Sequence, residues 1–200
     1  MFRELSDQLT EANYKVLSFN WYQGARHFLT NKKVETPSDL NGQKIRTPGS
    51  PVWRKSVAAM GATPTPLDWS EVYPGIQQGV IDGAEAQHTA TYGSSLYEVV
   101  DYINKTGHFQ LMTGLVVGTR WFNSLPEDYQ NIVMEESIKA GDYASELTIE
   151  LGEKYESEME EMGVTIVEPD IEAFVESVQG VYEELGYNEL KEQIESEVLN

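Results

Sequence analysis

The sequence predicts an α/β fold, and three observations support this prediction. A run of β-branched and aromatic residues with rough alternation covers 15–30, which is typical of a strand. Apolar residues at steps of three and four extend over 127–162, which indicates one long helix. Between these two segments, short strand-like and helix-like stretches alternate, as they do in α/β proteins. With 200 residues, 40% of them hydrophobic, the chain can form one large core or two small ones.

The first sixty residues are expected to alternate between helix and strand. Phe2, Leu5 and Leu9 have helical spacing, and Gly24 is expected to bend the strand that follows. Pro48 ends a second, shorter strand. The expected elements are a helix over 2–12, a strand over 15–30, a loop with a short turn over 36–43, a strand over 44–48, and a helix over 51–60 that ends at Gly61.

The middle of the chain begins with a helix that Asp68 or Ser70 can cap. Its apolar positions are Val72, Ile76 and Val80, and Pro74 must lie in its first turn, where a missing N–H is tolerated. An Asp-Gly turn at 82–83 follows. The sequence then predicts a helix over 92–102 and a strand over 107–119, in which the residues from Leu115 to Val117 are the most core-like.

The last third is dominated by the long helix. Ser124 is its expected cap, Pro126 lies just inside it, and Gly163 ends it. Twelve acids and two lysines lie between 127 and 162, so its outer face must be solvated. A strand over 164–169 and two amphipathic helices complete the chain, with apolar positions at Phe174, Val178, Val181 and Leu185 and then at Leu190, Ile194 and Val198.

Composition excludes several classes of partner. The chain has 33 Asp and Glu against 14 Lys and Arg, a formal net charge of −19, which argues against nucleic acid and against insertion in or binding to anionic membranes. No apolar run approaches the ~20 residues that a membrane span needs. Zero cysteines excludes disulfides and thiolate sites. The first residues have neither a basic nor an apolar signal region, so we expect no export signal within this chain.

A search for catalytic and metal motifs is negative. The chain lacks G-x-G-x-x-G, G-x-x-x-x-G-K-[ST], H-E-x-x-H and G-x-S-x-G. His27, His88 and His108 are scattered without a second ligand at metal-like spacing, so each is expected to be structural or exposed. We therefore expect no cofactor, no metal and no catalytic residue. A hydrolase that uses Asp82 and Glu85 stays open as an alternative, although Asp-Gly is also an ordinary turn.

One region carries an ordered set of motifs. It contains "DLNGQKIR" at 39–46, "MGATPTPL" at 60–67 and "SEVYPGIQQGVIDG" at 70–83, with "INKTGHF" and "WFNSLPEDYQNIV" further along. Together these stretches resemble the DctP-type solute-binding proteins of TRAP (tripartite ATP-independent periplasmic) transporters. The resemblance covers nearly the whole chain and is more specific than any single short motif.

The resemblance implies a two-lobe fold like that of periplasmic binding proteins, of a type II-like kind, with a long helix that bridges the lobes. It also implies that roughly another hundred residues of the family pattern, with the export signal, are absent, so the N-terminal lobe is incomplete. The expected division assigns 1–23 and 112–151 to the remnant of the N-terminal lobe and 24–111 and 152–200 to the C-terminal lobe.

The implied function is extracytoplasmic capture of a small organic acid. The acid would bind in a cleft between the lobes, hinge closure would bury it, and TRAP permease subunits in the membrane would recognise the closed form. No bond is made or broken, so the chain would not be an enzyme. The implied location is periplasmic, or extracellular and attached to the membrane. The identity of the acid and the oligomeric state are left open.

The resemblance also implies the binding residues. Arg46 in "KIRTP" would form a bidentate salt bridge with the carboxylate of the ligand, for which a planar guanidinium is well suited. Arg26 matches a second arginine position, and Trp69 matches an aromatic position that packs on the ligand. Where the family often has a polar contact after "DG", this chain has Ala86 followed by Gln87.

Each of these assignments has a structural alternative. Arg46 could pair with one of the many surface acids, and Trp69 could be a core residue. A further alternative for the whole chain is a truncated α/β fragment that binds no ligand and associates with itself through its exposed core.

Overall fold

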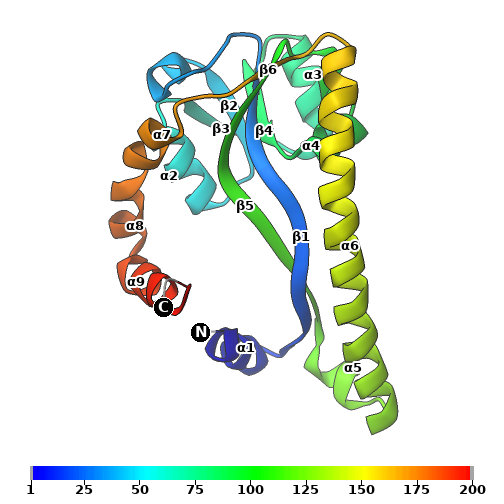
Figure 1. Cartoon of the computed structure of the whole chain (residues 1–200). Helices are drawn as coiled ribbons and strands as arrows, with labels where there is room; N and C mark the ends of the chain where they lie inside the picture. Colours follow the sequence, from blue (N-terminus) through cyan, green and yellow to red (C-terminus); the bar gives the residue numbers. More distant parts are fainter. Residues whose placement is uncertain (1, 199–200) are drawn as a thin grey trace. The chain divides into compact units, whose positions relative to one another are not determined.

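The structure is a computed structural model that describes residues 2–198, with side chains described from 6 to 197. The predicted apolar positions Phe2, Leu5 and Val198 therefore lie outside the described side chains. In chain order the elements are α1 (Phe2–Glu11), β1 (Tyr14–Thr30), η1 (Pro37–Leu40), β2 (Lys44–Thr47), α2 (Pro51–Ala59), β3 (Thr63–Pro66), η2 (Trp69–Glu71), α3 (Val72–Gln77), β4 (Gly83–Ala86), α4 (His88–Gly93), η3 (Leu96–Glu98), β5 (Tyr102–Gly118), α5 (Thr119–Asn123), α6 (Glu127–Glu161), β6 (Thr165–Val167), α7 (Ile171–Ser177), α8 (Gln179–Leu185) and α9 (Asn188–Val198), as Figure 1 shows.

The strands form one six-stranded mixed sheet in the order β3-β2-β4-β1-β5-β6. Strand β2 runs parallel to both β3 and β4, and β5 runs parallel to β6, whereas β1 is antiparallel to β4. The α/β prediction is therefore confirmed. Within residues 2–198, no helix has both the length and the apolar character that a membrane crossing requires.

The chain divides into two compact units. Unit 1 comprises 1–24 and 110–154, and unit 2 comprises 25–109 and 155–200. Strands β1 and β5 and helix α6 each contribute residues to both units. These boundaries lie within three residues of the expected ones, and the assignment of the units to an N-terminal and a C-terminal lobe stays a prediction.

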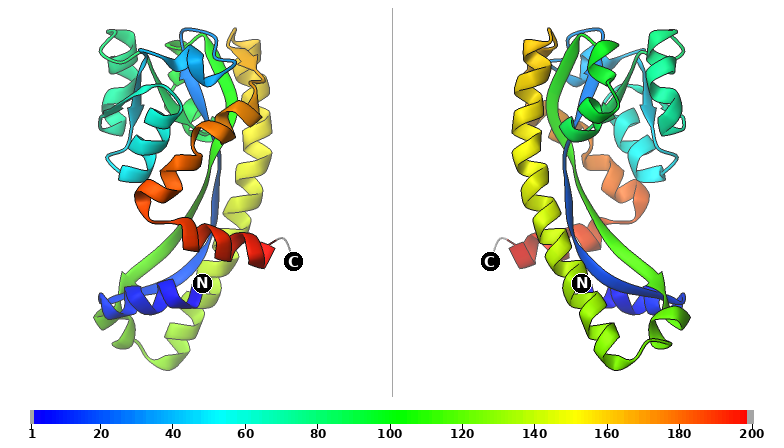
Figure 2. Two further views of the ribbon diagram at one scale, coloured as in Figure 1. Left: turned by 90° about the vertical axis from the view of Figure 1, so that its left-hand side faces the viewer. Right: turned by 90° about the vertical axis from the view of Figure 1, so that its right-hand side faces the viewer.

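The core of unit 2 lies on both faces of its part of the sheet. Phe28 and Leu29 are neighbours on β1 and therefore point to opposite faces. Leu29 belongs to a cluster that α3, η3 and the end of α6 cover, and Phe28 belongs to a cluster that η1, α2 and α7 cover. The views in Figure 2 show α7 and α8 beside α2, and the ion pair between Lys55 and Glu184 joins α2 to α8 at 2.5 Å.

Unit 1 buries far less apolar surface. Among its described residues, the buried hydrophobic side chains are Val16, Leu17 and Phe122. Polar contacts connect β1 to α6 instead: the Asn20 side-chain amide donates to Asp142 at 2.7 Å, and the Ser145 hydroxyl donates to the Asn20 carbonyl at 2.7 Å. A Cβ at Gly141 would overlap the Asn20 side chain, so a larger residue there would displace Asn20 from its hydrogen bond to Asp142.

The long helix and the strands over 15–30, 44–48 and 164–169 are confirmed, but the helix over 92–102 is wrong. This segment forms α4 and η3 and then enters β5 at Tyr102. Helix α4 ends at Gly93, and Ser95 adopts a left-handed conformation with φ of 53°, which a continuous helix cannot contain.

Val80 was assigned wrongly to the buried face of the preceding helix. Helix α3 ends at Gln77, and Gly79 has a φ of 70°, so Val80 lies beyond the helix and is 53% exposed. The prediction that 115–117 lie in the core is also wrong for Leu115 and Val116. These residues lie on the part of β5 in unit 1 and are 40% and 50% exposed.

Two further differences concern β3 and the helices at the C-terminal end. Strand β3 contains two prolines, which fits its place at the edge of the sheet, where one side of the strand makes no ladder hydrogen bonds. The expected pair of C-terminal helices is three helices, because the first expected helix divides at Val178 into α7 and α8.

Candidate functional site

Arg46 lies near the end of β2, between Thr65 on β3 and Ala84 on β4. It is only 7% exposed. Its Nε donates a hydrogen bond to the carbonyl oxygen of Leu67 at 2.8 Å, and its guanidinium carbon lies 5.2 Å from the ring centroid of Trp69. These two contacts fix the plane of the guanidinium group.

The terminal nitrogens of Arg46 make no hydrogen bond to any residue in the described part of the chain. A buried cation without a carboxylate partner is unusual, because burial is costly unless the charge is paired. The Nη1 and Nη2 groups together form the planar fork that matches a carboxylate. Arg46 is therefore held by its Nε in a position to receive an anionic group from outside the chain.

Arg26 on β1 is bound in the opposite way. Its Nε and Nη2 contact the two carboxylate oxygens of Glu85, and the Nη2–Oε1 distance is 2.8 Å. Its Nη2 also donates to the Glu85 carbonyl oxygen at 2.6 Å, and its Nη1 donates to the Gln87 side-chain oxygen at 2.8 Å. Most of its donors are used within the protein, so its main role in this structure is to hold Glu85 and Gln87.

His108 on β5 also approaches Glu85. Together with Arg26, Arg46, Glu85 and Gln87 it forms a group of residues that we call the arginine cluster. Its Nε2 lies 3.7 Å from Glu85 Oε2, its Nδ1 lies 2.6 Å from the Thr106 hydroxyl, and its ring stacks on Phe28 at 4.3 Å between centroids. Strands β1, β4 and β5 are neighbours in the sheet, which is why these residues meet although they are distant in sequence.

The electrostatics of the cluster leave one positive charge. Burial by itself would raise the pKa of Glu85, but its contacts with His108 and Arg26 outweigh burial and lower the pKa, so Glu85 is ionised. Burial lowers the pKa of His108, although Glu85 partly opposes this, and His108 is neutral. Burial also lowers the pKa of Arg46, but arginine keeps its charge at any relevant pH. The buried groups Arg26, Arg46 and Glu85 together carry one net positive charge, and the exposed Asp68 adds a nearby negative charge that also acts on Arg46.

The other two histidines are structural. The backbone N–H of Gly107 donates to His27 Nδ1 at 3.1 Å, and burial, with the charges of nearby groups, lowers the pKa of His27 to about 3. His88 Nε2 lies 2.9 Å from Glu156 on α6, and its ring lies 4.7 Å from that of His27. Across residues 2–198 there is no group of three or more His, Asp or Glu side chains that could hold a metal ion.

The structure brings four of the five predicted site residues into contact in two pairs. Trp69 lies over Arg46, and Gln87 accepts from Arg26. Trp69 is 36% exposed, and its indole N–H donates to the Ser94 hydroxyl at 3.1 Å, so it is not a core residue. Ala86 is 1% exposed and packs in the cluster around Leu29, and a ligand contact at this position stays a prediction.

The sequence did not single out Glu85 and His108 as members of the buried cluster that contains Arg26. The signal for Glu85 was a carboxylate inside the short apolar segment "GAEA", because a charge in a buried strand requires a partner. No comparable signal marks His108, whose role depends on the pairing of β5 with β1.

The structure also separates Asp82 from Glu85. Asp82 is exposed and accepts a hydrogen bond from the backbone N–H of Lys44 at 2.7 Å, whereas Glu85 is fully buried against Arg26. The two carboxylates therefore serve two different structural contacts.

Comparison with known proteins identifies the family. Residues 1–189 match the family described as bacterial extracellular solute-binding protein, family 7, or DctP. A solute-binding protein of Roseobacter denitrificans is 33% identical over 86% of this chain and 53% of its own length. The ectoine-binding periplasmic protein TeaA of Halomonas elongata is 32% identical over 80% of this chain and 49% of its own length. The chain thus spans about half the length of these curated relatives.

Solved structures agree with this result. A TRAP periplasmic solute-binding protein from Escherichia fergusonii has a TM-score of 0.89 and 47% identity, over 98% of this chain and 66% of that one. A second, from Actinobacillus succinogenes with bound L-galactonate, has a TM-score of 0.86 and 34% identity, over 90% of this chain and 60% of that one.

These relatives are binding proteins of transporters with a two-lobe fold, and they are not enzymes, so the hydrolase alternative is wrong. The resemblance that the sequence motifs suggested is confirmed. This chain belongs to family 7 of the bacterial extracellular solute-binding proteins, the DctP family.

Proposed function

We propose that the chain is the solute-binding component of a TRAP transporter and that it captures a small organic acid at Arg46. The observation that carries this proposal is the free guanidinium fork: Arg46 is buried, fixed through its Nε, and without a hydrogen-bond partner at its terminal nitrogens among residues 2–198. A carboxylate would supply the missing partner in bidentate geometry.

The neighbours of Arg46 favour a hydroxylated acid with an apolar face. The Trp69 ring is partly exposed beside the guanidinium, and it offers a surface for stacking. The Gln87 side chain uses its oxygen to accept from Arg26, while its amide N–H groups have no described partner and can donate to a hydroxyl. TRAP periplasmic solute-binding proteins from Ochrobacterium anthropi and Citrobacter koseri are solved with bound L-fuconate and D-glucuronate, respectively, which supports sugar acids as the ligand class.

Arg26 and Glu85 complete the proposed site as positioning residues. Glu85 holds the Arg26 guanidinium in two places, and Arg26 in turn holds the Gln87 amide. The buried groups Arg26, Arg46 and Glu85 carry a single net positive charge, and Asp68 adds a negative charge near Arg46, so one ligand carboxylate is preferred to two.

Delivery to a membrane permease and a periplasmic location are part of the same proposal. They rest on relatives named as periplasmic binding proteins, such as the C4-dicarboxylate-binding protein of Vibrio cholerae. In this proposal the ligand would leave the protein chemically unchanged.

Thermal denaturation with a panel of acids tests the proposal. The panel contains L-galactonate, L-fuconate, D-glucuronate and succinate. A ligand at ~100 times its dissociation constant should stabilise the folded state by ~2.7 kcal/mol. Arg46→Ala should abolish that stabilisation, whereas Arg54→Ala, which removes an exposed arginine on α2, should leave it unchanged.

A ligand-side control separates charge from shape. D-glucuronamide keeps the ring and hydroxyls of D-glucuronate but lacks the carboxylate charge, so it should give no stabilisation. Equal stabilisation of the wild type and Arg46→Ala by the acid, or no response to any acid, would contradict the proposal.

A further inference from the structure

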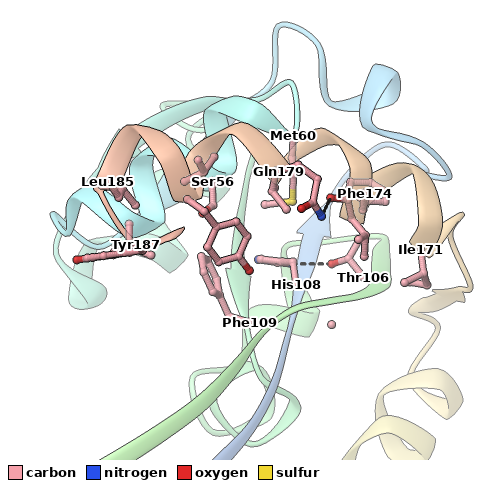
Figure 3. Close-up of a pocket in the computed structure, with 16 residues that line it drawn as sticks. Ser56, Met60, Thr106, His108, Phe109, Ile171, Phe174, Gln179, Leu185 and Tyr187 are labelled. Atoms are coloured by element: carbon pink, nitrogen blue, oxygen red, sulfur yellow. Dashed lines mark hydrogen bonds between the residues drawn. The ribbon is translucent and has the colours of Figure 1, made fainter. Parts of the chain in front are cut away.

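We propose that unit 2 contains a second binding site, separate from Arg46, which takes a small neutral aromatic molecule such as a phenol. The site is a cavity of about 290 Å³ between β5, α2, α7 and α8 (Figure 3). His108 lines this cavity, whereas Arg26, Arg46, Glu85, Gln87 and Trp69 do not.

The walls of the cavity are largely apolar and rich in rings. Phe109 and Phe174 line it from β5 and α7, and Tyr182 and Tyr187 line it near the end of α8. Figure 3 shows Phe109, Phe174 and Tyr187 around the same hollow, with His108 between them. Aromatic side chains prefer ring partners in offset or edge-to-face packing, so this lining favours a flat ring over a flexible chain.

The cavity carries no formal charge, although the chain as a whole has a net charge of −19. No Asp, Glu, Lys or Arg side chain lines it. Its one titratable group of the physiological range, His108, is neutral because burial lowers its pKa. An ion would lose its hydration here without gaining a partner, so the cavity selects against the organic acids that Arg46 is placed to hold.

A few polar groups remain available for orientation. Ser56 on α2 is only 7% exposed, and its hydroxyl makes no hydrogen bond to any residue of the described chain. The Tyr182 hydroxyl at the other side likewise has no described hydrogen-bond partner, although its ring packs against Lys191. Tyr182 is 37% exposed, so its hydroxyl lies at the open side of the cavity, and either hydroxyl can form a hydrogen bond with the hydroxyl of a phenol.

The volume sets the size of the molecule. An apolar cavity of about 150 Å³ is known to admit benzene, and ordinary ligand pockets begin at about 300 Å³. A cavity of about 290 Å³ therefore accommodates one substituted ring or two fused rings. An amphipathic molecule with one hydroxyl and one ring matches both the lining and the free polar groups.

The probe for this site is 4-fluorophenol, followed by fluorine NMR on the whole chain. We expect its resonance to shift and broaden on addition of protein, and we expect the methyl signals of Val178 and Val181, which line the cavity, to move in a carbon-methyl spectrum. Arg46→Ala should leave both effects intact. This control distinguishes the cavity from the acid site, so failure of either proposal leaves the other unaffected.

Ser56→Phe fills the cavity from α2 and should abolish the shift while the far-ultraviolet circular dichroism stays unchanged. Val178→Phe fills it from the junction of α7 and α8 and replaces Ser56→Phe if that variant does not fold. Unmoved methyl signals at millimolar 4-fluorophenol would overturn the proposal, as would an undiminished shift in the filled variant or a shift that disappears with Arg46→Ala.

Discussion

Strand β5 contains Ile103 near its start in unit 2, where this residue is fully buried, and Val116 near its end in unit 1, where this residue is 50% exposed. Helix α6 shows the same contrast, because Met159 in unit 2 is fully buried while Ile149 in unit 1 is 55% exposed. The residues are similarly hydrophobic at both ends of each element. Burial in this chain is thus set by what covers an element and not by the side chains that it carries.

The two units also treat polar groups differently. In unit 2, Glu85 and Arg26 form a buried ion pair between neighbouring strands, and their exposed fractions are 0% and 7%. In unit 1, Glu135 and Glu136 pair with Lys139 on the exposed surface of α6. Interior pairs are costly to break and surface pairs are not, so the two units should respond very differently to the same kind of substitution.

The largest expected effect is from Glu85→Ala. Removal of this carboxylate leaves the Arg26 guanidinium buried without its partner, and breaking a buried pair costs about 3–5 kcal/mol. Urea denaturation followed by circular dichroism measures the change in the free energy of unfolding. Glu135→Ala in unit 1 is the matched control and should produce no measurable change. Equal effects of the two substitutions would contradict the contrast between interior and surface pairs.

Ile103→Ala should have the next largest effect. Ile103 lies in the cluster around Leu29, and truncation of a fully buried isoleucine costs about 2–5 kcal/mol through lost burial and a residual cavity. The same denaturation experiment measures it. Ile149→Ala on the exposed part of α6 is the matched control, and a loss as large as that of Ile103→Ala would show that this part of α6 is covered in solution.

The sequence singled out Arg46 because its motif and its chemistry point to the same role, and that role stays a prediction. Local signals also identified β1, β2, α2 and α6, whose periodicity is long or whose ends carry proline or glycine. The helix over 92–102 was wrong because Leu96, Val99 and Val100 have helical spacing, but the left-handed Ser95 interrupts the helix.

The buried cluster was less accessible to sequence reasoning. Glu85 and Arg26 are 59 residues apart, and their contact depends on the antiparallel register of β1 and β4, which pairs Phe28 with Glu85. The exposure of Leu115 and Val116 could not be predicted either, because periodicity identifies an apolar face without indicating whether a second layer covers it.

A pH titration of stability tests the polar interior of unit 2. The folded state keeps His27 neutral down to a pKa of about 3, while the unfolded chain protonates this residue near 6.5. The unfolded state therefore binds more protons between these values, so stability is full above pH 6.5 and falls as the pH decreases, by up to about 1.4 kcal/mol per pH unit. His88 and His108, whose pKa values are also lowered, act in the same direction.

The substitution His27→Asn removes one titratable histidine. The asparagine side-chain oxygen can still accept the hydrogen bond from the Gly107 N–H that His27 Nδ1 accepts in the wild type. Between pH 6 and 4, the slope of the free energy of unfolding against pH should decrease by an amount that corresponds to the uptake of about one proton on unfolding. Urea denaturation at several pH values measures this slope, and an unchanged slope would mean that His27 is protonated in the folded state.

The smallest expected effect is from Val116→Thr, and it is the most direct test of the contrast within β5. Threonine keeps the β-branched shape that a strand favours and exposes a hydroxyl where valine exposes a methyl group. Because Val116 is half exposed, we expect the free energy of unfolding to change by less than about 0.5 kcal/mol. Sedimentation equilibrium of both proteins at several concentrations completes the test. If Val116→Thr destabilises the chain by several kcal/mol, or dissociates an oligomer, then another polypeptide surface covers this end of β5. The difference in burial between the two units would then hold for the isolated chain and not for the protein in solution.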